Sequence, residues 1–274
     1  MKAPLLKRIL KLLLPPVIFD IWSHTKARFG LSKRWIDTTV PTFEYIPSGW
    51  EYASNPEVRG WNVVDILERY KQKWPAYLQR VEGTTPLGFS LESALDAPDD
   101  LSHQNTALVF AYGLAMAAQG KRTLSMLDWG GAIGQYYVLA QALFPDLAID
   151  YHCKDVAIMA EHGKALFPLA HFYLDDACFE NSYDFALASG ALQYSQDWKM
   201  DFDRLAGSSG QYLLITRLPV VENSKSFVFI QRSYSYGYNT AYLAWCINKR
   251  EILGRAKEKR LLLLREFIIG DTHP

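Results

Sequence analysis

The stretch that most limits what this chain can fold into is a short apolar run that ends in glycines. Residues 124–134 read Leu-Ser-Met-Leu-Asp-Trp-Gly-Gly-Ala-Ile-Gly, and a segment with helical spacing follows. Glycine lets the backbone turn sharply and approach a ligand with no Cβ in the way, and the start of a helix attracts anions such as phosphate. The stretch therefore predicts a strand, a tight turn and a helix that together hold a nucleotide-containing cofactor.

Short apolar segments alternate with helical ones from this point to the end of the chain. Helices are expected over residues 134–144 and 156–166, and strands over 124–127, 148–153, 171–174, 185–188, 212–216 and 261–268. Apolar strands separated by helices form parallel sheets that are covered on both faces. The pattern therefore predicts an α/β fold with a doubly wound, mostly parallel, Rossmann-like sheet in a domain of residues 101–274.

Residues 1–100 are predicted to form a helical and irregular N-terminal extension. Residues 30–60 are rich in Pro, Gly, Trp and Tyr and show no sustained periodicity. A helix over 63–78 should bury one stripe, made of Val64, Leu67, Tyr70 and Trp74. A second helix over 104–118 follows Asp100, a residue type that caps helix starts.

Acidic residues follow the second and third predicted strands. Asp155 comes just after the second strand, about 20 residues beyond the glycine turn, where a carboxylate can accept hydrogen bonds from both ribose hydroxyls. Asp175 and Asp176 follow the third strand and could receive an adenine amino group. Each acid alone also fits a solvated carboxylate at a strand end. Because ligands of open α/β sheets bind at the carboxyl ends of the strands, the three together favour a cofactor site.

These motifs resemble those of class I S-adenosylmethionine-dependent methyltransferases. The resemblance lies in Leu127-Asp128-x-Gly130-Gly131-x-x-Gly134, in Asp155 and in the segment Tyr183–Tyr194. It covers about residues 100–270 and, more loosely, the N-terminal third of the chain. With Thr216–Pro219 included, the arrangement is similar to methyltransferases associated with surface-polysaccharide gene clusters. The resemblance implies O-methylation of a sugar or glycan intermediate. It also implies that S-adenosyl-L-methionine is held by Asp128, Trp129, Gly130, Gly131, Gly134, Asp155, Asp175, Asp176, Ser189 and Gln193.

Two features depart from the family pattern. Ala132 occupies a position in the turn where family members commonly have glycine. After residues 261–268 the chain is too short for the seventh strand that usually closes the sheet, unless Phe227–Ile230 replaces it. Both departures fit the alternative of a catalytically inactive, methyltransferase-like binding or scaffold protein. A nicotinamide oxidoreductase is a third interpretation, which the Gly-Gly-Ala-x-Gly spacing disfavours because it is not the dinucleotide pattern.

Aromatic side chains near the predicted site could steady a sulfonium by a cation–π contact, which is worth about 0.5–2 kcal/mol. Trp129, Tyr136 and Tyr194 are candidates by position, and each also fits simple packing in the core. Tyr194 is the preferred catalytic candidate of the three. Methyl transfer depends mainly on holding donor and acceptor in line without water, so few other groups are needed.

A hydroxyl acceptor would also need a general base. His103, at the start of the helix before the first strand, is the preferred histidine, with a capping or surface role as the alternative. His152 lies inside a predicted strand and is interpreted as structural. Arg217 follows the fifth strand and could bind an anionic substrate group through two hydrogen bonds, or could equally form a structural ion pair.

The charge balance and the cysteine content limit the kinds of partner and bound metal that the chain is expected to have. The chain has 274 residues, and its 29 Lys and Arg balance its 29 Asp and Glu, whereas a nucleic-acid-binding protein usually carries a basic surplus. Cys153, Cys178 and Cys246 are scattered, with no C-x-x-C pair, so neither a disulfide framework nor a metal site is expected. A cytoplasmic protein with a small-molecule or glycan acceptor is predicted, and the sequence carries no signal for an oligomeric state.

Residues 1–20 are basic and apolar. Their longest apolar run, Leu12–Phe19, is too short to span a membrane and contains two prolines. Basic residues among leucines suit a helix that lies on an anionic membrane surface: Lys2, Lys7, Arg8 and Lys11. A terminal helix packed on the domain fits the same residues.

Overall fold

The computed structural model describes residues 41–92 and 98–270. Contacts between residues divide the chain after Val40, and residues 41–274 make up one compact unit. The predicted membrane-surface helix of residues 1–20 lies outside the described residues.

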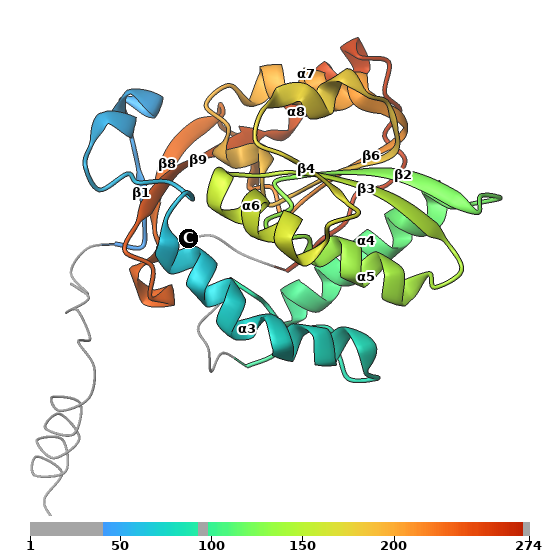
Figure 1. The fold of residues 1–274 in the computed structure, drawn as a ribbon. Coiled ribbons are helices and arrows are strands. Elements are labelled where there is room, and N and C mark those ends of the chain that lie inside the picture. The colour runs from blue at the N-terminus through green and yellow to red at the C-terminus, as the bar shows by residue number, and fades with distance from the viewer. Residues whose placement is uncertain (1–40, 93–97, 271–274) are drawn as a thin grey trace, which may run out of the picture. The chain divides into compact units, whose positions relative to one another are not determined.

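A five-stranded parallel sheet forms the centre of this unit (Figure 1). Its strands are β2 (Thr123–Trp129), β3 (Ala148–Lys154), β4 (His171–Tyr173), β5 (Tyr183–Ser189) and β6 (Ser209–Thr216). Their order is β4-β3-β2-β5-β6, and every neighbouring pair is parallel. The first five predicted strands and the doubly wound Rossmann-like fold class are thus confirmed. The direction of winding reverses between β2 and β5, the point where such sheets bind ligands.

Helices cover both faces of the sheet. They are α3 (Val64–Glu82), α4 (Leu101–Ala117), α5 (Gln135–Leu143), α6 (Ala157–Leu166), α7 (Trp198–Ser208) and α8 (Lys249–Glu258). Alternate residues of β2 face opposite sides: Met126 packs in a cluster with α3, α4 and α5, and Leu127 packs in a cluster with α7. Both faces of β2 are therefore buried, which explains why its middle residues, Met126 and Leu127, are both apolar.

Helix α3 buries a different stripe from the predicted one. Tyr70 and Trp74 are buried as expected, but Val64 is 63% exposed, so its assignment to the stripe is wrong. The buried residues are Ile66, Tyr70, Lys73, Trp74, Tyr77 and Val81. Their spacing of three and four residues continues along the whole helix, which extends to Glu82, and this longer register sets the face that packs.

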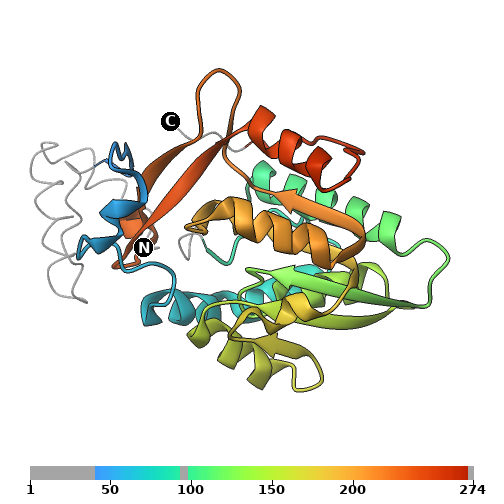
Figure 2. The same cartoon turned by 90° about the horizontal axis from the view of Figure 1, so that it is seen from above.

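A second, four-stranded sheet lies beside the first (Figure 2). Its strands are β1 (Phe43–Tyr45), β7 (Val220–Val221), β8 (Phe227–Arg232) and β9 (Ala241–Asn248), in the order β1-β8-β9-β7. β8 and β9 pair antiparallel. The expectation of a wholly irregular segment over residues 30–60 is therefore wrong at β1, which pairs with β8. Phe227–Ile230 is a strand, but it adds no seventh strand to the central sheet.

Short 3-10 helices complete the regular structure: η1 (Gly49–Ser54), η2 (Asp176–Glu180), η3 (Leu192–Tyr194) and η4 (Ser233–Tyr236).

The sixth predicted strand is wrong, because residues 261–268 have no regular secondary structure. Arg260 adopts φ +60° and turns the chain out of α8. The segment then runs along α4, where the Asn105 side-chain amide donates to the Ile269 carbonyl and the rings of Tyr112 and Phe267 meet edge to face. Leu262 stays 81% exposed. An apolar run alone cannot distinguish a buried strand from an extended surface segment.

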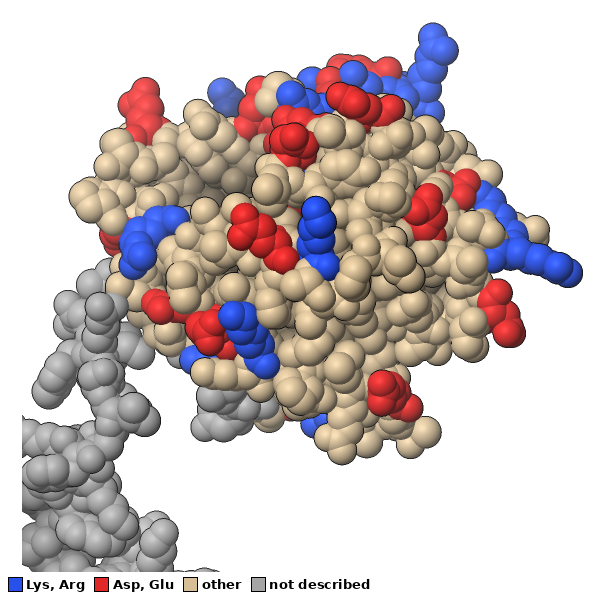
Figure 3. Space-filling view, in the orientation of Figure 1, with Lys and Arg blue, Asp and Glu red and all other residues tan. Residues whose placement is uncertain are grey.

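Charged side chains of both signs are interspersed over the face of the molecule seen in Figure 3. Neither sign gathers there into one continuous patch. Among the described residues, no helix is long and apolar enough to cross a membrane.

Candidate functional site

The glycine turn joins β2 to α5 at the winding-reversal point of the sheet. Gly130 has φ +77° and Gly134 has φ +97°, conformations that side-chain-bearing residues rarely adopt. A Cβ on Gly130 would lie 2.3 Å from Cβ of Ala191, and one on Gly131 would lie 2.4 Å from Oδ2 of Asp128. The protein's own packing therefore already requires these two glycines, so their presence alone does not demonstrate a ligand.

Ala132 adopts a left-handed backbone conformation, which favours glycine. Its φ is +49°, which costs an L-residue about 1–2 kcal/mol. Its backbone N–H donates to Oδ2 of Asp155 at 2.7 Å. Asp155 thus reaches back from the end of β3 and holds the strained part of the turn.

Asp155 has the position expected for a ligand-binding carboxylate. Its Oδ1 accepts the Val156 N–H at 2.7 Å, and the side chain is half-buried. Burial raises the pKa of Asp155 to about 6, although the hydrogen bonds from Ala132 and Val156 lower it. Each carboxylate oxygen has a second lone pair, so ribose hydroxyls could still donate to it.

Asp128 lies beneath the turn, with no exposed surface. Its Oδ2 accepts the Tyr151 hydroxyl at 2.6 Å. Burial raises the pKa of Asp128 to about 7, against the lowering effect of the Tyr151 hydrogen bond. Asp128 therefore supports the turn from below.

Buried polar atoms at the carboxyl ends of three strands lack hydrogen-bond partners within the described part of the chain. They are Asp128 Oδ1 and Trp129 Nε1 at the end of β2, Gln193 Oε1 after β5, and Thr216 Oγ1 at the end of β6. A buried polar atom left unpaired costs about 1–3 kcal/mol, so a ligand or water that pairs with these atoms would recover that energy. Such atoms and the Asp155 carboxylate fit a polar, nucleoside-containing cofactor at this edge.

Asp175 and Asp176 both have protein partners. Asp175 caps η2 by accepting the Ala177 N–H, and Asp176 forms ion pairs with Lys154 and Arg204. Both acids are exposed at the end of β4. They stand at the predicted edge of the sheet, with their carboxylates directed to these partners.

Ser189, at the end of β5, is linked to the start of α5. Its Oγ lies 2.6 Å from the Tyr136 hydroxyl, and both groups are buried. Gln193 follows in η3 and donates from Nε2 to the Arg217 carbonyl at 3.2 Å. These bonds connect the segments that follow β2, β5 and β6.

Arg217 forms an ion pair with Glu92, at 3.1 Å from Nη1 to Oε1 and 2.6 Å from Nη2 to Oε2. This is the structural ion pair that the sequence left as one of two alternatives. Burial would raise the pKa of Glu92, but the charge and hydrogen bonds of Arg217 bring it below the ordinary value. Glu92 is a site residue that sequence reasoning missed, because it lies in an irregular segment 125 positions from its partner.

A small cavity of about 70 Å³ adjoins this ion pair. Its lining includes Tyr77, Glu92, His103, Tyr136 and Arg217. His103 and Arg217 therefore line the same cavity. The cavity has room for several ordered waters.

Tyr194 faces the second sheet. Its hydroxyl donates to Gln231 Oε1 at 3.1 Å, and its ring packs edge to face on Trp61 and Tyr242. The residues that line the cavity do not include it.

Glu92→Ala is expected to lower the free energy of unfolding by about 2 kcal/mol. The change leaves the Arg217 guanidinium, only 25% exposed, without its partner, and breaking a fully buried pair costs about 3–5 kcal/mol. The control is Glu222→Ala, which removes a 71% exposed partner of Lys249 and should cost under about 0.5 kcal/mol. Chemical denaturation measures both, and equal losses would contradict the role assigned to the Glu92–Arg217 pair.

No protein-family model and no curated protein sequence matches this chain. Solved structures resemble it at low scores. An O-methyltransferase family protein from Burkholderia thailandensis aligns over 77% of this chain and 72% of its own, with 17% identity and a TM-score of 0.43. An S-adenosylmethionine-dependent methyltransferase from Clostridium acetobutylicum aligns over 69% and 87%, with 11% identity and a TM-score of 0.42.

The plantazolicin methyltransferase BpumL, solved in complex with SAH, aligns over 56% of this chain, with 15% identity and a TM-score of 0.35. The chain spans only 63% of that enzyme. With scores this low, the cofactor, reaction and acceptor of this chain are matters for proposal.

Proposed function

We propose that this chain is an S-adenosylmethionine-dependent methyltransferase. One observation carries the proposal: at the winding-reversal point of the sheet, Asp155 is bonded to the turn after β2 at Ala132. A carboxylate in this place accepts hydrogen bonds from ribose hydroxyls. The unpaired polar atoms at the neighbouring strand ends support the same assignment.

The proposed cofactor residues divide by position. Gly130, Gly131 and Gly134 shape the turn, with Asp128 and Trp129 at its start, and Asp155 binds ribose. Asp175 and Asp176 lie toward adenine, and Ser189 and Gln193 lie beneath the methyl donor. When bound, S-adenosyl-L-methionine supplies an electrophilic methyl group. The chain's own task is to orient the acceptor and exclude water.

For the acceptor we propose a small molecule that is methylated on oxygen, in particular a sugar or glycan intermediate. The cavity beside the cofactor edge supports this, because a hydroxyl acceptor there would lie among polar groups. His103 is the proposed general base, and Arg217, with its charge shared with Glu92, is proposed to position the acceptor. Tyr194 is proposed to shape the site from the side of the second sheet.

Two further proposals come from the sequence alone. The protein is proposed to act in the cytoplasm, and residues 1–20 are proposed to contact the inner face of the membrane. The basic residues among leucines in that segment support the second proposal.

A catalytically inactive scaffold remains the rival function. The φ of +49° at Ala132 and a central sheet of five strands, with no seventh strand among the described residues, favour it. The two functions differ in whether the chain binds the methyl donor.

Asp155→Asn is expected to weaken binding of S-adenosylmethionine at least about 10-fold, because a hydrogen bond to a charged group contributes about 1.5–3 kcal/mol. Isothermal titration calorimetry of the full chain with the donor and with S-adenosylhomocysteine measures this. Asp146→Asn, at an exposed residue in the loop between α5 and β3, is the matched control and should bind as the unaltered chain does. Thermal melting establishes that each variant is folded.

The outcomes separate the alternatives. No heat of binding in the unaltered chain would favour the scaffold. Binding that Asp155→Asn leaves unchanged would show that the cofactor lies elsewhere.

A further inference from the structure

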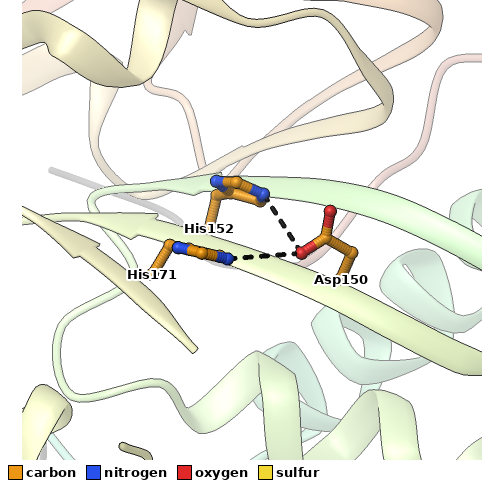
Figure 4. A group of neighbouring side chains, drawn as sticks. All are labelled: Asp150, His152 and His171. Atoms are coloured by element: carbon orange, nitrogen blue, oxygen red, sulfur yellow. Dashed lines mark ion pairs between the residues drawn. The ribbon is translucent and has the colours of Figure 1, made fainter. Parts of the chain in front are cut away.

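Three side chains with no recognisable metal-binding spacing in the sequence meet on one face of the central sheet, at the edge formed by β4. They are Asp150, His152 and His171. Asp150 and His152 are two residues apart on β3 and so point to the same face. His171 on β4 is the direct partner of His152 in the strand register. Figure 4 shows the two imidazoles projecting side by side from adjacent strands, with the Asp150 carboxylate at their ends. Strand pairing, not sequence spacing, brings the three together.

The distances in this cluster are those of metal ligands. Oδ1 of Asp150 lies 3.3 Å from Nε2 of His152 and 3.6 Å from Nε2 of His171. The three ligand atoms all lie within 4.8 Å of one another. A tetrahedral ion with bonds of about 2.0–2.1 Å places its ligand atoms about 3.3 Å apart. A direct charge-assisted hydrogen bond would instead draw nitrogen and oxygen to about 2.7–2.9 Å.

The residues around His152 hold its imidazole ring in an orientation that suits metal binding. Its side chain is 11% exposed and packs against Tyr173 and Tyr183. Its Nδ1 lies 2.9 Å from the Tyr173 hydroxyl. A proton on Nδ1, donated to that hydroxyl, leaves the Nε2 lone pair directed at the cluster, and such an outer hydrogen bond is typical of metal-bound histidine.

The other two ligands can adjust to an ion. The side chains of Asp150 and His171 are 51% and 55% exposed. The imidazoles of His152 and His171 are stacked, with centroids 4.4 Å apart and planes at 16°, so their lone pairs run nearly parallel. Rotation of the exposed His171 ring brings its Nε2 toward the same point as that of His152. The exposed side of the cluster leaves a coordination position for water.

We propose that Asp150, His152 and His171 bind a divalent first-row transition-metal ion such as Zn²⁺ and so fasten the edge strand β4 to β3. Two imidazoles and one carboxylate suit such ions and not Mg²⁺, which prefers oxygen ligands. Because β4 has only three residues, a metal link across it would stabilise the edge of the sheet. The proposal is independent of the methyltransferase assignment, since none of the three residues belongs to the cofactor site.

The test is a titration of the untagged full chain, first treated with a chelator, with ZnCl₂ alone. We expect saturable 1:1 binding, and a rise in melting temperature with zinc because the ion binds only the folded state. His171→Ala and Asp150→Ala should each weaken binding at least about 10-fold, since even outer-shell partners contribute 10–100-fold. Both residues are exposed, so their loss leaves the core intact. The matched control is His162→Ala on α6, which should bind zinc as the unaltered chain does.

Co²⁺ provides an independent readout, because strong visible absorption marks a four-coordinate site and distinguishes it from the hydrated ion. The proposal is overturned if the unaltered chain shows no 1:1 zinc binding, if His171→Ala binds zinc equally well, or if Mg²⁺ competes with Zn²⁺ at equal concentration. Any of these results would leave the cluster as a stacked histidine pair beside a carboxylate.

Discussion

Gly130→Ala is expected to lower the free energy of unfolding by about 3 kcal/mol. Two effects add. The backbone at Gly130 has φ +77°, which costs a residue with a Cβ about 1–2 kcal/mol. The new Cβ would lie 2.3 Å from Cβ of Ala191, and the shifts needed to relieve such overpacking cost typically about 1–3 kcal/mol. Because Ala191 follows β5, the contact joins the turn after β2 to the loop on the other side of the winding-reversal point.

Two further variants separate the effects. Gly120 has nearly the same φ, +71°, with no atom within 4 Å of a Cβ placed there. Gly120→Ala should therefore show only the backbone cost, about 1 kcal/mol. The double variant Gly130→Ala with Ala191→Gly removes the opposing methyl group and should recover the packing part of the loss. Urea denaturation of the four proteins measures these differences. A loss for Gly130→Ala no larger than that for Gly120→Ala would contradict the close contact with Ala191.

The central sheet could be predicted from sequence because both of its faces are buried. Residues such as Met126 and Leu127 pack into opposite clusters. Strands such as β5, with Phe185–Ala188, therefore carry short apolar runs that stand out between the helices. The same reasoning failed for residues 261–268. That segment also begins with an apolar run, Leu261–Leu264, but it follows the left-handed turn at Arg260 and lies exposed along α4. Whether an apolar run finds a partner strand depends on contacts that no local pattern contains.

Some residues of the candidate site could likewise be predicted from sequence, and others could not. Asp155 and the glycine turn could be predicted, because each lies directly after a strand and parallel strands end at one edge. The pairing of Arg217 with Glu92 could not be predicted, because it spans 125 positions and Glu92 lies in a segment without periodicity. His152 was interpreted as a structural residue, because the sequence does not reveal that His171 is its partner across the sheet.

Asp128→Asn is expected to remove most of a steep pH dependence of stability. The Asp128 carboxyl is fully buried, and burial raises its pKa to about 7 in the folded chain. In the unfolded chain the pKa is about 3.9. Between about pH 4 and pH 7, the Asp128 carboxyl is therefore protonated in the folded state and ionised in the unfolded state. Stability must therefore fall as the pH rises through that window and then level off.

The size of the effect follows from the shift. About three pKa units correspond to about 4 kcal/mol at 1.36 kcal/mol each. Asparagine is neutral at every pH, and its carbonyl oxygen can still accept the Tyr151 hydroxyl that Asp128 accepts. The unaltered chain and Asp128→Asn should therefore differ most above pH 7, where the variant is the more stable, and least near pH 4. The pKa of Asp155 is raised in the same direction, so part of the slope should persist in the variant.

Chemical denaturation at half-unit steps from pH 4 to pH 8 measures both curves. Asp146→Asn, which removes an exposed carboxylate instead, should keep the slope of the unaltered chain. Parallel curves for the unaltered chain and Asp128→Asn would mean that the buried carboxyl is already ionised at pH 4. A charge would then lie beneath the turn at neutral pH, and the Asp128 oxygen without a partner among the described residues would need a donor that a bound cofactor or water must supply. The pH curve therefore tests whether burial keeps the Asp128 carboxyl protonated in the folded chain.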